Sequence, residues 1–141
     1  MAFVHGKGSV FSLDDSGGTL RTLTSYVDDC TGLPGARDLS EVTAFGDSGE
    51  KNIPGLQRVS FSIKGSWDST ATTGPHAVLN SLRAAANTAT FEYGPEGSTA
   101  GKIKLTGECW LSDYTVDASV AEKVAYSASF KVDGTVTSTL Y

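Results

Sequence analysis

The sequence predicts a mainly β fold of the α+β class: a two-sheet antiparallel β-sandwich or barrel with one flanking α-helix. Three segments alternate apolar and polar residues, which is the pattern of strands with one buried and one solvated face. Their apolar positions are Val59, Phe61, Ile63, Gly65 and Trp67; Ile103, Leu105, Gly107, Cys109 and Leu111; and Val124, Tyr126, Ala128, Phe130 and Val132. One apolar stripe at helical spacing and 16 glycines, many within turn-forming clusters, complete the prediction.

The N-terminal part predicts short strands followed by a long polar segment. Residues 10–13 predict a first strand, which the turn formers of residues 14–18 end. A second apolar and polar segment runs over residues 20–27. Residues 28–58 are polar and rich in Gly and Pro, with one candidate strand at residues 41–45. Because loops this long are uncommon in compact domains unless they have a function, we expect residues 28–58 to form a long loop or hairpin arm.

The helix is predicted over about residues 75–87. Pro75 suits a first helical turn, because its missing N–H would lack an intrahelical partner there anyway, and Thr72, Thr73 or Gly74 precedes it as a cap. Apolar side chains then recur on one side of the helix, at Val78, Leu79, Leu82, Ala85 and Ala86. A helix of about three turns must dock on a sheet to be stable.

The C-terminal part predicts four further strands, at residues 89–93, 102–114, 122–132 and 135–141. The second and third form a long antiparallel pair. Asp133-Gly134 is a two-residue hairpin signal, which places a turn before the last strand. The chain length of 141 residues predicts one domain, over residues 1–141.

The composition is that of a globular protein, with 39% hydrophobic and 19% charged residues. No stretch approaches the roughly 20 apolar residues that cross a bilayer, and the first residues lack the apolar block of a secretory signal. We therefore expect synthesis in the cytoplasm and no membrane partner. Cys30 and Cys109 could pair with each other, but without an export signal free thiols are expected.

The net charge of −5 is concentrated in the first part of the chain. Residues 1–50 hold eight acidic and three basic residues, whereas residues 51–141 hold eight of each. This distribution excludes the basic footprint of a nucleic-acid-binding protein. The carboxylates either solvate loops or form an acidic surface that repels phosphate.

No catalytic, cofactor or metal site is predicted. Gly46-Asp47-Ser48-Gly49 is similar to the nucleophile motif of chymotrypsin-like proteases, but the next residue is Glu50 and the only histidines are His5 and His76. A turn explains the motif, and a hydrolase built on Ser48 is the weaker alternative.

Metal and phosphate chemistry have no sequence support either. The adjacent pairs Asp14-Asp15 and Asp28-Asp29 point to opposite faces of a strand and cannot converge on one ion, which leaves only incidental calcium binding on a loop. The glycines form no phosphate-cradling motif.

The two tryptophans occupy different positions in their strands. Trp67 shares the apolar parity of its strand and is predicted to be in the core. Trp110 has the opposite parity from Leu105 and Leu111 and is grouped with Tyr114. Either this pair of aromatic residues is exposed and belongs to an interface, or the strand is covered on both faces.

Two passages resemble the tail tube proteins of long-tailed, non-contractile phages. They are Val42-Thr43-Ala44-Phe45-Gly46-Asp47-Ser48-Gly49 and the segment from Gly65 to Val78, which contains Trp67-Asp68-Ser69-Thr70-Ala71 and Gly74-Pro75. The resemblance extends from about residue 4 to about residue 132 and rests on the order and spacing of motifs that are individually weak. It implies the tail-tube fold, with no enzymatic activity and no cofactor.

The resemblance also implies an assembly. Six subunits of such proteins close a ring, rings stack into a hollow tube in the virion tail, and DNA passes through without specific binding. The implied partners are further copies of the chain, the tape-measure protein, tail assembly chaperones, a tail terminator and distal tail proteins, with assembly in the bacterial host cytoplasm. The long loop of the family contacts neighbouring rings, and here it corresponds to residues 28–58.

These expectations select the candidate site residues. The candidate interface residues for ring closure or stacking are Arg37, Glu41, Thr43, Phe45, Asp47, Lys51, Trp110 and Tyr114. The candidate acids facing a lumen are Asp28, Asp29 and Glu41. A different class of function is a carbohydrate- or surface-binding β-sandwich module that uses exposed aromatic residues such as Trp110.

Overall fold

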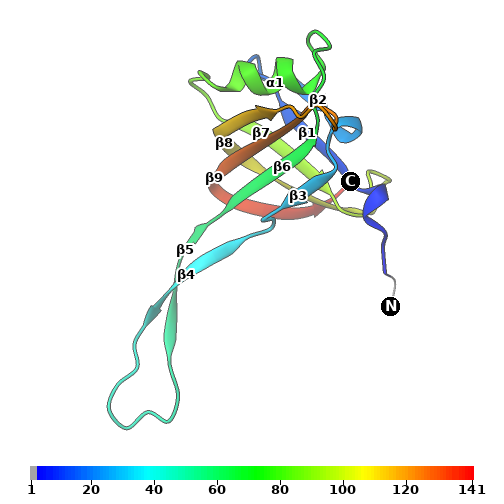
Figure 1. Cartoon of the computed structure of the whole chain (residues 1–141). Helices are drawn as coiled ribbons and strands as arrows, with labels where there is room; N and C mark the ends of the chain where they lie inside the picture. Colours follow the sequence, from blue (N-terminus) through cyan, green and yellow to red (C-terminus); the bar gives the residue numbers. More distant parts are fainter. Residues whose placement is uncertain (1–2) are drawn as a thin grey trace.

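Nine strands and one α-helix make up the computed structural model, which describes residues 3–141. Seven strands form one antiparallel sheet in the order β2-β1-β7-β8-β9-β6-β3, and β4 and β5 form a separate hairpin that leaves the body as an arm (Figure 1). The bounds are β1 Val10–Asp14, β2 Leu20–Thr22, β3 Asp29–Thr31, β4 Ala36–Glu41, β5 Asn52–Arg58, β6 Ser60–Ser66, α1 Pro75–Leu82, β7 Ala89–Gly94, β8 Ile103–Asp117 and β9 Ala125–Leu140. Two short 3-10 helices, η1 Gly6–Gly8 and η2 Thr24–Tyr26, flank β1 and β2.

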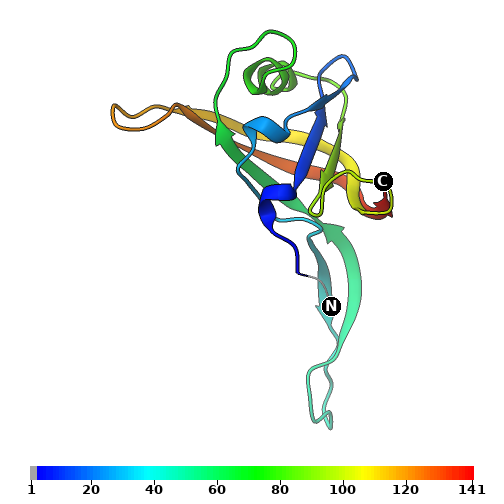
Figure 2. The same ribbon diagram turned by 90° about the vertical axis from the view of Figure 1, so that its right-hand side faces the viewer.

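The seven-stranded sheet bends on itself and encloses the core. Phe61 of β6 lies 4.7 Å from Phe91 of β7 between ring centroids, although two strands separate β6 from β7 in the sheet. Phe61 also stacks on Phe130 of β9, at 4.9 Å. The two layers expected from the sequence are therefore two halves of one continuous sheet, and Figure 2 shows its strands on two sides of the body.

The alternation in the sequence matches the burial of β6 and β9. Phe61, Ile63 and Gly65 are buried in β6, and the serines and lysine between them lie on the outer face. Tyr126, Ala128, Phe130 and Val132 are buried in β9. The period-two pattern thus places one face of each strand against the core, as predicted.

The helix begins where the sequence predicts and ends earlier. Gly74 precedes Pro75 as the N-cap, and Val78, Leu79 and Leu82 are buried against the sheet. The prediction that the helix extends to residue 87 is wrong, because after Leu82 the chain tightens into turns and must reach β7 at residue 89. Figure 1 shows α1 lying across one end of the sheet.

Of the two predicted alternatives for residues 28–58, a long loop or a hairpin arm, the structure has the hairpin arm. Its strands, β4 and β5, do not lie where the sequence predicts a strand. The predicted strand at residues 41–45 is wrong: β4 ends at Glu41, and residues 42–51 form the tip of the hairpin. Residues 20–27 contain the short strand β2 and then η2. The register of β4 and β5 pairs Glu41 with Asn52 and Ala36 with Arg58.

The predicted hairpin turn at Asp133-Gly134 is also wrong. β9, which is 16 residues long, continues through these two positions without a turn. Its pairing with β8 shifts between Thr106↔Thr137 and Glu108↔Asp133. Gly134 has a φ of +92°, a conformation that glycine adopts without a steric penalty. The turn former therefore makes a bulge inside a strand, which increases the local twist of the sheet.

Candidate assembly surfaces

Every residue of the strands of the arm is exposed. β4 and β5 contain no buried position, so the hairpin contributes nothing to the core. Several large apolar side chains lie on it, at Leu39, Val42, Phe45, Ile53 and Leu56. Phe45 at the tip is as exposed as in an extended peptide, with a relative exposure of 109%. Exposed apolar groups in this density are typical of an interaction surface.

The tip is nevertheless ordered by its own polar contacts. The backbone N–H of Ala44 donates to Asp47 Oδ2 at 2.7 Å, and Lys51 Nζ lies 2.9 Å from Asp47 Oδ1. The backbone N–H of Lys51 donates to Thr43 Oγ1 at 2.9 Å. These contacts fix the turn that Gly46-Asp47-Ser48-Gly49 predicted, and they hold the loop from which Phe45 projects.

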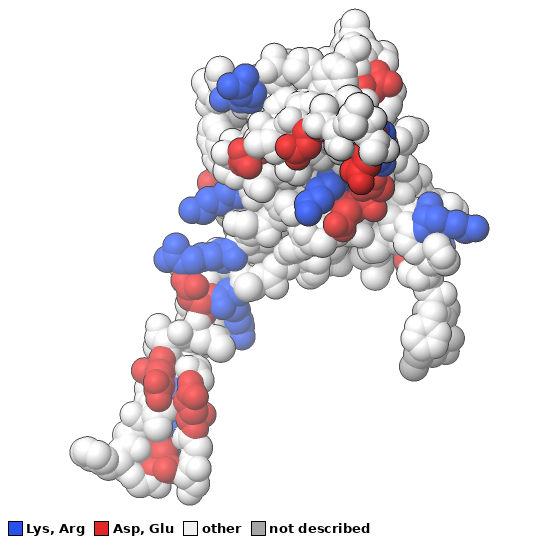
Figure 3. Space-filling model, viewed as in Figure 1, with Lys and Arg blue, Asp and Glu red and all other residues white. Residues whose placement is uncertain are grey.

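Electrostatics distinguish the tip of the arm from its root. The Ala44 N–H and the Lys51 ammonium together hold the pKa of the Asp47 carboxyl below its usual value. At the root, Arg58 forms an ion pair with Asp38. Figure 3 shows acidic side chains along the outer part of the arm and basic side chains where the arm joins the body.

The predicted interface residues divide between the arm and the body. Six of them lie together on the arm: Arg37 and Glu41 on β4, and Thr43, Phe45, Asp47 and Lys51 at the tip. Sequence reasoning missed the apolar side chains of Leu39, Ile53 and Leu56 on the same hairpin, because residues 28–58 are polar overall and these three are isolated along the chain. Residues 52–58 show no period-two pattern, because Ile53 and Leu56 are three positions apart and Pro54 and Gly55 lie between them.

Trp110 and Tyr114 lie on opposite faces of β8, which corrects the predicted grouping. The pairing of β8 with β9 shifts between Leu111↔Phe130 and Asp113↔Ser129, so one extra residue reverses the parity. Trp110 is exposed on the outer face, whereas Tyr114 packs against the core.

Tyr114 instead connects three elements inside the body. Its hydroxyl accepts from Trp67 Nε1 at 3.1 Å and lies 2.9 Å from His76 Nδ1 of α1. Trp67 is partly buried and packs against the core. An aromatic platform of two exposed rings, as a sugar-binding face would use, is thus reduced to Trp110 alone.

The three candidate lumen acids lie in two separate parts of the subunit. Asp28 forms an ion pair with Lys123 Nζ at 2.9 Å, and Asp29 pairs in register with Lys64 of β6. Glu41 lies at the outer end of β4 on the arm. Asp28 and Asp29 therefore lie side by side at the start of the edge strand β3, whereas Glu41 lies apart from them on the arm.

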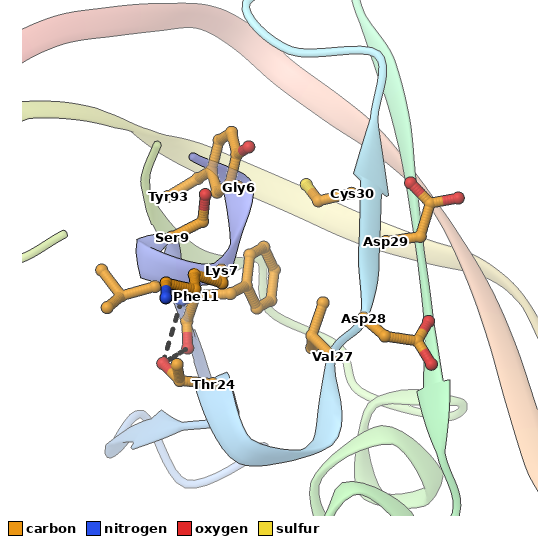
Figure 4. A pocket seen from close by; sticks show the side chains of 11 residues that line it. Gly6, Lys7, Ser9, Phe11, Thr24, Val27, Asp28, Asp29, Cys30 and Tyr93 are labelled. Atoms are coloured by element: carbon orange, nitrogen blue, oxygen red, sulfur yellow. Dashed lines mark hydrogen bonds between the residues drawn. The ribbon is translucent and has the colours of Figure 1, made fainter. Parts of the chain in front are cut away.

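A cleft of about 480 Å³ lies between β1 and the edge strand β3 (Figure 4). Phe11, Val27, Cys30 and Tyr93 contribute apolar and aromatic walls, and Asp28 and Asp29 lie at its rim. Burial raises the pKa of the Cys30 thiol to about 12, so it is a poor nucleophile at neutral pH. The cleft lies where the two edges of the bent sheet approach each other without pairing. The residues that line it include no histidine that could act as the base for a serine nucleophile.

Other chemistry finds no support among the residues that the structure describes. No group of three or more His, Cys, Asp or Glu side chains there could hold a metal ion. Cys30 and Cys109 are both free thiols. Within residues 3–141, no helix has both the length and the apolar character needed to span a membrane.

Solved structures share this fold over nearly the whole chain. A chain from the virion of a native gene transfer agent particle matches with a TM-score of 0.77 at 13% identity, covering 97% of this chain and 99% of that one. A chain from the tail of an empty gene transfer agent particle, refined with C6 symmetry, matches with a TM-score of 0.75 at 15% identity and the same coverage. The SPP1 tail tube protein matches with a TM-score of 0.72 at 12% identity, covering 99% of this chain and 80% of that one.

Comparison by sequence is less informative. No protein-family model matches the chain, and no curated protein sequence matches it significantly. The structural matches establish that the chain has the tail-tube fold, as the resemblance of its motifs implies.

Proposed function

We propose that the chain is a structural, non-catalytic subunit of a tail tube. Copies of it close into hexameric rings, and the rings stack into a hollow conduit for DNA in the tail of a virion or tail-like particle. The tail-tube fold supports this proposal, as does the C6 symmetry of the gene transfer agent tail to which the fold is similar. The role belongs to surfaces of the subunit, since tubes are built by repeated contacts between copies.

The observation that carries the proposal is the arm. A two-stranded hairpin with no buried residue is marginally stable by itself in water, and both of its edges present unpaired backbone groups. Its apolar side chains and the fully exposed Phe45 gain burial only when another molecule covers them. We assign the arm to contacts between rings, with Arg37, Glu41, Thr43, Phe45, Asp47 and Lys51 as its contact residues. Trp110 on the outer face of β8 is a second candidate contact.

The acidic groups have a proposed role in the conduit. A wall that carries carboxylates repels DNA phosphates, whereas each Lys or Arg contact would add affinity. Asp28, Asp29 and Glu41 are the candidates. Replacement of all three by Lys should slow the passage of DNA through assembled tails in an ejection assay, and unchanged passage would count against a lumenal position.

The proposed partners follow from the same role. They are further copies of the chain, a tape-measure protein inside the tube, assembly chaperones, a terminator at one end and distal tail proteins at the other. Assembly takes place in the cytoplasm of the bacterial host, and DNA passes without specific recognition.

Negative-stain electron microscopy of the concentrated protein tests the proposal. The wild-type chain should form rings or tubes, and Phe45→Ser should prevent stacking while leaving the thermal unfolding midpoint of the dispersed subunit unchanged, because Phe45 contacts no core residue. Ser48→Ala is the matched control, since Ser48 is an exposed neighbour in the same tip. It should assemble normally. Tubes formed equally by Phe45→Ser would refute the role of the arm.

A further inference from the structure

The β8–β9 ribbon is longer than the core that it covers. β8 has 15 residues and β9 has 16, which corresponds to a length of roughly 50 Å at about 3.3 Å per residue. The core-facing side of both strands is apolar in the middle, with Cys109, Tyr126 and Phe130 buried. The same side continues toward both ends of the ribbon, where its apolar residues Ile103, Leu140, Val116 and Val124 are exposed.

At one end the ribbon closes in a hairpin, which we call the hairpin end and define as residues 116–124. Val116 pairs in register with buried Tyr126, and Val124 precedes Tyr126 by two residues, so both face the core side of the ribbon. Val116 and Val124 are exposed nonetheless, and Val120 at the turn has a relative exposure of 109%. Figure 2 shows this hairpin projecting from one side of the body.

At the other end the two strands separate, and we call this the open end, defined by Lys102, Ile103 and Leu140. Ile103 pairs directly with Leu140, so the two side chains lie on the same face. Ile103 precedes buried Leu105 by two residues and therefore extends the core face outward. Both side chains are exposed. In Figure 2 the C-terminus, next to Leu140, lies on the side of the body opposite the hairpin.

The two ends also differ in charge. Asp117 and Glu122 on the hairpin end have no ion-pair partner among residues 3–141, while Lys123 is bound to Asp28. At the open end Lys102 likewise lacks a carboxylate partner within the described chain, and Lys104 is bound to Glu92. Glu96 is an acidic residue on the turn that follows β7, before the open end in the sequence. The difference in charge between the two ends therefore depends on Lys102. An acidic apolar tip and an apolar pair flanked by a lysine are complementary.

We propose that the hairpin end of one copy docks on the open end of the next copy, with Val120 against Ile103 and Leu140 and with Glu122 near Lys102. The occupant of each end is thus a second copy of this chain. Such a contact is heterologous, because different surfaces meet, and its repetition closes a ring when the rotation fits. The inference rests on the proposed tube function and supplies its lateral contact, whereas the arm supplies the contact between rings.

Two variants that each lose one end test the proposal by mixing. Val120→Asp places a charge on the hairpin end, and Leu140→Asp places one on the open end; both positions are exposed, so the subunit should keep its fold, which circular dichroism and thermal unfolding verify. Each variant alone should lose ring formation. The mixture should shift to a dimer of one copy of each, because one intact hairpin end and one intact open end remain available. Size-exclusion chromatography with light scattering measures the masses, and Ala86→Asp, at an exposed site away from both ends, is the matched control.

A cross-link reports on the contact independently of ring formation. Val120→Cys and Leu140→Cys chains, mixed and oxidised, should give a covalent dimer that neither variant gives alone. If wild-type rings form and Val120→Asp also forms them, the lateral contact is refuted while the tube function stands. If the cross-link forms but the wild-type chain gives no rings or tubes, the contact stands and the tube function is refuted. Absence of both refutes both.

Discussion

Asp47 organises the tip of the arm although the tip has no core. One carboxylate oxygen accepts from the backbone N–H of Ala44, and the other faces the ammonium of Lys51. A side chain that binds its own loop in this way replaces the contacts that a buried apolar residue would supply. The ionised Asp47 carboxylate thus stabilises the loop that carries Phe45, together with the hydrogen bond from the Lys51 N–H to Thr43 Oγ1.

The pKa of Asp47 predicts how the tip responds to acid. Because its folded-state pKa lies below the unfolded value, the stabilisation is present above the unfolded pKa and is lost as the pH falls through the folded pKa. The backbone amides of residues 44–51 should therefore exchange faster below about pH 4. In Asp47→Asn, they should exchange at this faster rate at neutral pH as well. Hydrogen exchange read by NMR, corrected for the intrinsic pH dependence of exchange, measures both effects.

The control for this prediction is Asp113→Asn, which changes an exposed acid on the body. It should leave the exchange of the tip unaltered. Protection of the tip that persists in Asp47→Asn would show that the hairpin strands alone determine its conformation.

Single residues also mark where prediction from sequence failed. The alternation of β8 was visible, but the extra residue near Ser112 was not, because a bulge leaves no period of its own. If the alternation is continued through the bulge without a shift, Tyr114 falls on the same face as Trp110. In the structure Tyr114 instead packs on the core and contacts Trp67 and His76. Gly134 shows the converse case, in which a strong turn signal serves a bulge within a strand.

At the scale of elements, the helix shows what local pattern can and cannot determine. The cap, the first-turn proline and the stripe of Val78, Leu79 and Leu82 fixed where α1 begins and which face is buried. The residue at which α1 ends could not be predicted from the sequence. Ala84, Ala85 and Ala86 favour a helix by propensity, but the connection to β7 requires a turn there. Tertiary connection overrode local preference.

Two substitutions on the predicted stripe should therefore have different effects. Leu79 is fully buried, so Leu79→Ala should lower the free energy of unfolding by about 2–5 kcal/mol through lost burial and the cavity left behind. Ala86 is exposed beyond the helix, so Ala86→Glu should change that free energy by no more than about 0.5 kcal/mol. Urea denaturation followed by circular dichroism measures both. A large loss in Ala86→Glu would mean that the apolar stripe is buried over its whole predicted length.

The arm is the other element whose nature depended on context. Its length and its Gly and Pro content indicated an extended segment with a function, and the structure gives a hairpin. The strand positions could not be deduced, because no buried face imposes alternation on β4 and β5. A strand that packs only against another molecule shows a weaker alternation of apolar and polar residues than a strand that packs against the core of its own chain.

At the scale of the whole molecule, the exposed apolar groups have a common arrangement. Most of them lie on projections from the body, at the arm, the hairpin end and the open end, whereas Trp110 lies on the outer face of β8, and the body itself has a single apolar core. A subunit of this kind is stable alone and gains further burial on association. The net charge of −5 opposes self-association, which favours a dispersed subunit until several contacts form together.

Assembly should therefore raise the thermal stability of the subunit by mass action. Contacts made only by the folded state stabilise it by about 2.7 kcal/mol when the free subunit is at 100 times the dissociation constant of the contact. For a chain of this size, that corresponds to an increase of roughly 5–10 °C in the unfolding midpoint. Differential scanning calorimetry of tubes and of diluted subunits measures the difference, which should vanish in Val120→Asp because that variant stays dispersed at every concentration. Equal midpoints for wild-type tubes and dispersed subunits would mean that association buries too little of the projecting surfaces to bias folding, and that the arm and the ribbon ends are not the contacts that hold the tube.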